Sequence, residues 1–198
     1  MKNTNRTYSL VHFLFNVFFK FGTAWELEGR DNIPEKGPLI VASNHISNWD
    51  PLVVGSALTR PIHFVAKKEL FKVPGFKGIL NHLGTISVDR GRPDRRAIRQ
   101  ALNVLDSEEV LGVFPEGTRS KPGKLRRAKL GIVMIALRSK APILPLGLTN
   151  TIKPFRKKIK VKIGQSFTLE EYYDRKLDKA EMKEAGAEIM DEIGQLIE

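Results

Sequence analysis

Cysteine is absent from this sequence, which excludes a disulfide framework, a thiolate metal site and a cysteine nucleophile. Histidine is scarce: four residues, at positions 12, 45, 63 and 82, argue against a zinc site built from protein ligands alone. No span stays apolar for the roughly 18 residues that a bilayer crossing requires. We therefore expect neither a bound metal nor a transmembrane helix.

The composition that remains is that of a globular protein. The chain has 198 residues, of which 41% are hydrophobic and 28% are charged, and these proportions argue against disorder and fibrous folds. This length suffices for one domain and gives only weak support for a second. No repeat, low-complexity tract or linker divides the sequence.

Positive charge is abundant and is concentrated in one block. Lysine and arginine number 33 against 22 acidic residues, which gives a net charge of +11. No Asp or Glu occurs from Gly117 to Leu169, whereas acids outnumber bases from Glu170 onward. A single lysine in such a block is most often a solvated surface residue, but the whole block favours an electrostatic function. The expected partner is anionic: nucleic acid, lipid headgroups or a phosphorylated substrate.

The most apolar stretch covers residues 10–21 and contains five of the eleven phenylalanines. His12, Asn16 and Lys20 interrupt it every four positions, which places them along one stripe of a helix. We predict an amphipathic helix within residues 1–25 that lies in a membrane interface with its Phe and Leu side chains buried. The alternative is a first helix that packs against the core. A secretory signal fits poorly, because no clear small-residue cleavage site follows.

Short apolar runs alternate with helical patterns along the rest of the chain. This alternation predicts an α/β fold: a single layered domain over residues 26–198, with a mixed, largely parallel sheet flanked by helices. Strands are expected over residues 25–28, 38–43, 62–66, 85–88, 110–114, 143–148 and 159–163, and helices over residues 50–58, 76–83, 94–105, 128–137 and 178–197.

A first group of candidate site residues follows the predicted strand at 38–43. His45 comes just after it, at the carboxyl end of a sheet, where α/β proteins gather their ligand sites. Histidine titrates near pH 6.5 and can act as a general base, best when a carboxylate fixes its tautomer. Asp50 is the only carboxylate nearby, but five positions correspond to about 140° on a regular helix, so pairing requires a turn leading into a helix at Pro51. The alternatives are a satisfied strand-end histidine and an aspartate that caps the helix.

A second group ends with Arg90, which follows the predicted strand at 85–88 and is expected at the same sheet edge. A planar guanidinium there suits bidentate binding of phosphate. Taken alone, however, the segment favours an Asp89–Arg90 ion pair that closes a turn.

A third group lies in the segment Phe114–Ser120, where a strand again leads into a loop. Gly117 allows a ligand close to the backbone, Thr118 and backbone N–H groups can donate to an anion, and Arg119 can pair with a phosphate. Glu116 borders the acid-free block, so we expect it to hold a basic neighbour or a substrate hydroxyl. An ordinary strand-to-helix loop is an equally good interpretation of this segment alone.

The segments Asn44-His45-x4-Asp50, Gly84–Arg90, Phe114–Ser120 and Pro142–Pro145 occur in this order. Together they resemble the glycerophosphate acyltransferase superfamily, and most closely the bacterial 1-acylglycerol-3-phosphate acyltransferases. The resemblance extends from about residue 29 to residue 164, and Lys67 and Lys129 also lie where similar proteins carry lysine. Four matches at family-like distances are hard to reconcile with chance.

The resemblance implies an O-acyltransferase that uses no cofactor. Such an enzyme transfers a fatty acyl group from acyl-CoA or acyl carrier protein (acyl-ACP) to the free hydroxyl of lysophosphatidic acid. The product is phosphatidic acid, for phospholipid biosynthesis. By this resemblance His45 removes the proton of the hydroxyl, while Asp50 orients the imidazole.

The resemblance also implies substrate-binding residues and a location. Arg90 and Arg119, with Lys67, would hold the acceptor phosphate. Asn44 and Thr118 would also bind substrate, and Glu116 and Gly117 would shape the acceptor site. The enzyme is expected at the cytoplasmic face of the cell membrane, as a peripheral or monotopic protein, because an anionic lipid surface attracts a basic protein face.

Three alternatives remain open from sequence. A nucleic-acid binder would use the same charge, but it leaves His45 and Asp50 unexplained, and only Phe155 lies within the basic run 153–162 to stack on bases. We therefore expect no nucleic-acid partner. The others are a non-catalytic membrane-surface module, and a related enzyme: an acyltransferase for another lysolipid or a lipid hydrolase. The sequence is silent on oligomeric state.

Overall fold

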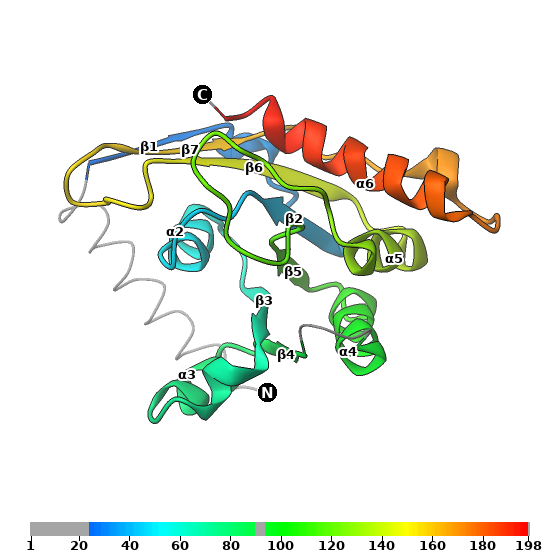
Figure 1. The fold of residues 1–198 in the computed structure, drawn as a ribbon, viewed down its shortest axis with the longest axis horizontal. Coiled ribbons are helices and arrows are strands. Elements are labelled where there is room, and N and C mark those ends of the chain that lie inside the picture. Colours follow the sequence, from blue (N-terminus) through cyan, green and yellow to red (C-terminus); the bar gives the residue numbers. More distant parts are fainter. Residues whose placement is uncertain (1–23, 90–93, 198) are drawn as a thin grey trace.

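The computed structural model describes residues 24–89 and 94–197 (Figure 1). The predicted N-terminal helix and Arg90 lie outside the described residues. The proposed domain boundary at residue 25 therefore stays a prediction. Within residues 24–89 and 94–197, no helix is both long and apolar enough to cross a bilayer.

The core of the fold is a seven-stranded sheet with the strand order β1-β7-β6-β2-β5-β3-β4. Neighbouring strands pair in parallel, except that β6 and β7 are antiparallel. This confirms the predicted mixed, largely parallel sheet. The strands are β1 (Trp25–Glu28), β2 (Leu39–Ser43), β3 (Ile62–Lys67), β4 (Ile86–Val88), β5 (Val110–Val113), β6 (Ile143–Thr149) and β7 (Ile159–Ile163).

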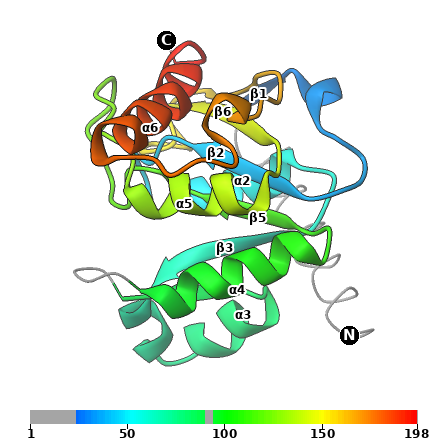
Figure 2. The ribbon, with the colours of Figure 1, turned by 90° about the vertical axis from the view of Figure 1, so that its right-hand side faces the viewer.

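Helices cover both faces of the sheet, with α4, α5 and α6 on one side and α2 on the other (Figures 1 and 2). The α-helices are α2 (Asp50–Ala57), α3 (Phe76–His82), α4 (Arg95–Asp106), α5 (Leu130–Ser139) and α6 (Lys179–Gly194), and the 3₁₀ turns are η1 (Arg30–Asn32), η2 (Lys68–Lys72) and η3 (Glu170–Tyr172). The start of α5 lies two residues after the predicted start, because the backbone of Lys129 is extended, with its N–H donating to the carbonyl of Pro115.

Strand β2 shows why its sequence is apolar throughout. Ile40 and Ala42 belong to the cluster beneath α4, α5 and α6, whereas Leu39 and Val41 belong to the cluster beneath α2. Successive side chains of a strand point to opposite faces, so a strand covered on both sides needs apolar residues at every position. The strand predicted over residues 38–43 is therefore confirmed, and it is the central strand of the sheet.

The parallel arrangement brings the predicted motifs to one edge. Strands β2, β5, β3 and β4 run in the same direction, so the loops that follow them leave from the same side of the sheet. Backbone contacts join two of these loops directly: the N–H of Ser120 donates to the carbonyl of His45 at 2.8 Å.

Helix α4 begins with an aspartate cap that also closes the segment after β4. The Asp94 carboxylate accepts hydrogen bonds from the backbone N–H of Ala97 and of Asp89, each at 3.0 Å. These bonds, first the one from Asp89, lower the pKa of Asp94 below its ordinary value. A carboxyl with a lowered pKa in the folded state adds stability above its unfolded pKa and loses it as the pH falls through the folded value.

We predict that Asp94→Ala lowers the free energy of unfolding at pH 7 by about 1 kcal/mol, the ordinary cost of removing a helix cap. The deficit relative to wild type should shrink as the pH falls below about 3.9, where the unfolded chain begins to bind the proton, and shrink further as the pH passes through the lowered pKa of the folded state. Urea unfolding over a pH series measures both effects. Asp94→Asn is the matched control: it keeps an acceptor and most of the stability, but not the pH dependence. An equal deficit for Asn and Ala at every pH would contradict the capping role.

Candidate active site

His45 and Asp50 form a hydrogen-bonded pair at the carboxyl end of β2. The distance from His45 Nδ1 to Asp50 Oδ2 is 2.8 Å, and the two side chains are 13% and 0% exposed. An ionised carboxylate only accepts, so Nδ1 carries the proton and Nε2 is left with its lone pair free to act as a base. The pairing predicted from sequence is therefore present.

The turn between β2 and α2 makes this pairing possible. Oδ2 of Asp50 also accepts hydrogen bonds from the N–H groups of Ile46 and Ser47, each at 2.7 Å. These bonds hold the turn tightly around the carboxylate and so bring it within reach of His45. Helix α2 starts at Asp50 with Pro51 in its first turn, and the hydrogen bonds of the carboxylate go to residues 45–47 and 151, none of which belongs to that helix. The interpretation of Asp50 as a helix cap is thereby ruled out.

Thr151 holds the other oxygen of Asp50, and the sequence analysis missed it. Its side chain is fully buried, and its Oγ1 donates to Asp50 Oδ1 at 2.5 Å. Thr151 follows β6, which is parallel to β2 and pairs with it from Ile40 to Ser43. A hydroxyl just beyond the predicted strand at 143–148 was the signal that could have found it, since parallel neighbours end at the same edge.

Glu116 is a second buried carboxylate, 1% exposed, that joins the loops after β2 and β5. Its Oε1 accepts from the N–H of His45 at 3.1 Å and from Ser120 Oγ at 3.3 Å, while Oε2 accepts from the N–H of Arg126 at 3.0 Å. These donors are backbone and hydroxyl groups of the protein, not a basic side chain. Glu116 therefore shapes the site by fixing the backbone of His45, and its contact with a substrate stays a prediction.

Asn44 has a comparable role in fixing the backbone. Its amide donates from Nδ2 to the carbonyl of Leu148 at 2.9 Å and accepts at Oδ1 from the N–H of Leu148 at 2.7 Å. The residue is only 2% exposed. Asn44 thus ties the end of β2 to β6, and its predicted role in binding substrate is untested.

Three of the remaining predicted substrate-binding residues, Gly117, Thr118 and Arg119, follow β5 in the loop of Glu116, and a fourth, Lys67, ends β3. Gly117 has φ of +67°, and a Cβ there would lie 3.0 Å from the Lys129 side chain, so glycine fits this bend. Thr118 is half-buried and Arg119 is exposed. Lys67 ends β3 and pairs with Glu69 at 3.4 Å.

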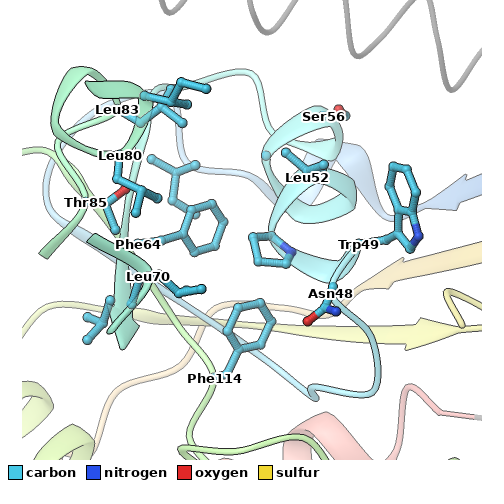
Figure 3. A pocket seen from close by; sticks show the side chains of 16 residues that line it. Asn48, Trp49, Leu52, Ser56, Phe64, Leu70, Leu80, Leu83, Thr85 and Phe114 are labelled. Carbon is cyan, nitrogen blue, oxygen red and sulfur yellow. The ribbon is translucent and has the colours of Figure 1, made fainter. Parts of the chain in front are cut away.

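An apolar cavity of about 550 Å³ lies next to the dyad. Its walls come from α2, from β3 and from the η2–α3 segment, and Figure 3 shows Phe64 and Phe114 facing Leu52 of α2 across it. The ring of Phe114 also stacks on His45, with the centroids 4.2 Å apart. This volume falls in the range of small-molecule sites, and the imidazole lies directly behind one wall of the cavity.

The described residues contain no cluster of three or more His, Asp or Glu side chains that could hold a metal ion. The chemistry that this arrangement offers is that of a base. A histidine with a fixed tautomer stands between an apolar cavity and loops rich in basic residues, which suits proton removal from a substrate that is apolar at one end and anionic at the other.

The fold and the family of this chain are shown by comparison with known proteins. The crystal structure of the 1-acyl-sn-glycerophosphate (LPA) acyltransferase PlsC from Thermotoga maritima is similar, with a TM-score of 0.77 and 25% identity over 98% of this chain and 81% of that one. A 1-acyl-sn-glycerol-3-phosphate acyltransferase from Borreliella burgdorferi is 36% identical over 70% of this chain and 56% of its own length. One of the same name from Bacillus subtilis is 34% identical over 69% of this chain and 70% of its own length.

The chain thus spans about half the length of some curated relatives that it matches, such as the Borreliella burgdorferi protein. A family model described as Acyltransferase matches residues 24–149, which include the dyad, the cavity walls and the loop of Glu116. The chain therefore belongs to the acyltransferase family.

Proposed function

We propose that this chain transfers a fatty acyl group from acyl-CoA or acyl-ACP to the free hydroxyl of 1-acylglycerol 3-phosphate, forming phosphatidic acid. One observation carries the proposal: His45, with its tautomer fixed by a buried aspartate, stacks on Phe114 in the wall of an apolar cavity. The names of the relatives supply the acceptor, and the basic residues around the dyad suit its phosphate.

In the proposed reaction Nε2 of His45 takes the proton of the acceptor hydroxyl while the oxygen attacks the thioester carbonyl. A carbon–oxygen bond forms, the carbon–sulfur bond breaks, and the leaving thiolate recovers the proton from the imidazolium. Asp50 stabilises the imidazolium while it exists. A positioned base contributes about 10²–10⁴-fold, and holding donor and acceptor together contributes further.

The apolar cavity is the proposed site of a fatty acyl chain. Phe114, which stacks on His45, lines this cavity together with Phe64 and Leu52, so a chain bound there would lie against the ring that contacts His45. Each methylene removed from water adds about 0.8 kcal/mol, so such a cavity gives an acyl group most of its binding energy.

The phosphate of the acceptor is assigned to Arg119 and Lys67, with Arg90 as a further ligand and Thr118 as a donor. Arg119 is exposed in the loop that Glu116 holds against His45, so an acceptor bound there could present its hydroxyl to Nε2. The reaction needs no cofactor or metal. Its acceptor and its product are lipids, so we place the enzyme on the anionic cytoplasmic face of the cell membrane.

We predict that His45→Ala lowers kcat by at least about 10²-fold while lysophosphatidic acid still binds, because the variant loses the base and keeps the phosphate site. Release of free thiol from the donor measures turnover, and calorimetry measures binding. His82→Ala, an exposed histidine of α3, is the matched control and should retain full activity. Substantial turnover by the His45 variant would refute the base assignment.

We predict that Arg119→Ala raises the KM for lysophosphatidic acid about 10- to 100-fold, the worth of one hydrogen-bonded charge on a phosphate. The KM for the thioester donor should change little. The control is Arg138→Ala, an exposed arginine in the last turn of α5, which should alter neither constant. Equal effects on donor and acceptor would show that Arg119 is not a phosphate ligand.

A further inference from the structure

The loop 150–158, which connects β6 to β7, carries exposed apolar and basic side chains together. Ile152 is 47% exposed and Phe155 is 59% exposed. Lys153, Arg156 and Lys157, which alternate with them along the loop, are exposed as well. No acidic residue occurs within the loop. An aromatic and an aliphatic side chain are thus displayed amid at least three positive charges.

Hydrogen bonds between its own residues hold the loop in a defined conformation. The N–H of Arg156 donates to the carbonyl of Lys153 at 3.0 Å, and the N–H of Lys157 donates to the same carbonyl at 3.2 Å. Asn150 closes the base of the loop by donating from Nδ2 to the carbonyl of Lys158 at 3.0 Å. A preformed loop binds at a lower entropic cost than one that must be ordered on contact.

The loop lies beside the part of the cavity wall that Trp49 forms. The ring of Phe155 meets that of Trp49 edge-on, with the centroids 5.8 Å apart, and Trp49 lines the cavity. In Figure 1 the loop projects from the end of the sheet near α2. At the base of the loop, the N–H of Ile159 donates to the carbonyl of Ala24, so the chain that follows the Phe-rich stretch 10–21 joins the fold at the same place.

This combination fits one partner best, the surface of an anionic bilayer. Apolar side chains bind at the boundary between headgroups and acyl chains, while neighbouring cations bind lipid phosphates. Single-stranded nucleic acid would call for several stacking rings, and the loop offers only Phe155. Because the loop borders the cavity, a bilayer bound to the loop would have its acyl chains close to the cavity.

We propose that the loop 150–158 is a membrane-binding element, with Ile152 and Phe155 inserted among anionic lipids and Lys153, Arg156 and Lys157 on their phosphates. The inference rests on the proposed function in one respect: if the substrates are lipids, a loop that binds a bilayer beside the cavity brings them close to it. Binding to vesicles is nevertheless measured without turnover, so the two proposals can fail separately.

The test is the triple variant Lys153→Gln, Arg156→Gln, Lys157→Gln in flotation with vesicles of phosphatidylcholine and 30% phosphatidylglycerol. Partitioning should fall about 100-fold, since each basic residue near the surface contributes about a factor of five. The control, Lys176→Gln, Lys179→Gln, Lys183→Gln, makes the same change in net charge at exposed positions in and just before α6 and should bind like wild type. Ile152→Ser, Phe155→Ser should also weaken binding.

The outcomes separate the possible partners. The proposal is overturned if the loop variant binds vesicles like the wild type, or if the control variant in and before α6 loses as much vesicle binding as the loop variant. A loss of affinity for acyl carrier protein with vesicle binding intact also overturns it, and would assign the loop to an acidic protein. The loop variant should keep wild-type activity toward a short-chain acceptor below its micelle concentration. If the wild type binds vesicles but transfers no acyl group, the proposed function fails and the loop assignment stands.

Thr151 carries a second inference, from a different observation. Asp50 is fully buried, and its Oδ2 is already shared between His45 and two backbone N–H groups. The Thr151 hydroxyl is the donor to Oδ1, at 2.5 Å. Removing it leaves a buried carboxylate oxygen short of a partner and frees the carboxylate to rotate away from the imidazole. We infer that Thr151 is a positioning residue for the proposed dyad.

Thr151→Val keeps the shape of the side chain and removes the hydroxyl. It should lower kcat about 10- to 100-fold with both KM values unchanged, and Thr151→Ser should restore most of kcat. In protein labelled with ¹⁵N-histidine, the downfield Nδ1–H signal of His45, assigned by its loss in His45→Ala, should weaken in the Val variant and return in the Ser variant. This signal needs no substrate, so it is independent of the proposed function. An unchanged signal and kcat in Thr151→Val, or no rescue by Ser, would refute the inference.

Discussion

The geometry of the site depends on the burial of one carboxylate. Asp50 is inaccessible to solvent, and a charge in that position is tolerated only where donors surround it. Its two oxygens accept hydrogen bonds from the turn after β2, from the imidazole of His45 and from the hydroxyl of Thr151. These donors lie in the segments that follow two parallel strands, β2 and β6. The same bonds that stabilise the buried charge therefore fix the tautomer and direction of the histidine. Removing any one donor costs more than a single surface hydrogen bond, because the charge has no solvent to replace it.

Glu116 repeats this arrangement one strand away. It too is buried, and it accepts from the backbone of His45 and of Arg126. The loop of the candidate base is consequently held by carboxylates on both sides, one at its side chain and one at its N–H. Within the described residues every buried side-chain polar atom has a hydrogen-bond partner. A site satisfied in this way is ordered before substrate arrives, which lowers the cost of reaching a reactive arrangement.

The apolar cavity and the basic loops place two opposite chemistries within reach of one imidazole. Phe114 links the imidazole to the cavity, because its ring stacks on His45 and lines the cavity. The loop of Phe155 meets Trp49 at the same cavity, so the edge of the site carries apolar and basic groups together. This arrangement suits an amphipathic substrate delivered from a lipid surface better than a small soluble one. The net charge of +11 favours an anionic partner, as the proposed function requires.

The sequence by itself determined the class of fold and the order of its elements. The apolar run at 38–43 favoured a strand, and strands alternating with helices led to a mostly parallel sheet. It also singled out His45 and Asp50 as a candidate pair, although the residues alone left open a strand-end histidine and a helix cap. Only the tertiary structure decided that Glu116 and Asn44 fix backbone, that Thr151 completes the surroundings of Asp50, and that α2 and α3 enclose a cavity. These features join residues as many as 104 positions apart, and local pattern carries no information on which distant groups a folded sheet brings within hydrogen-bond distance.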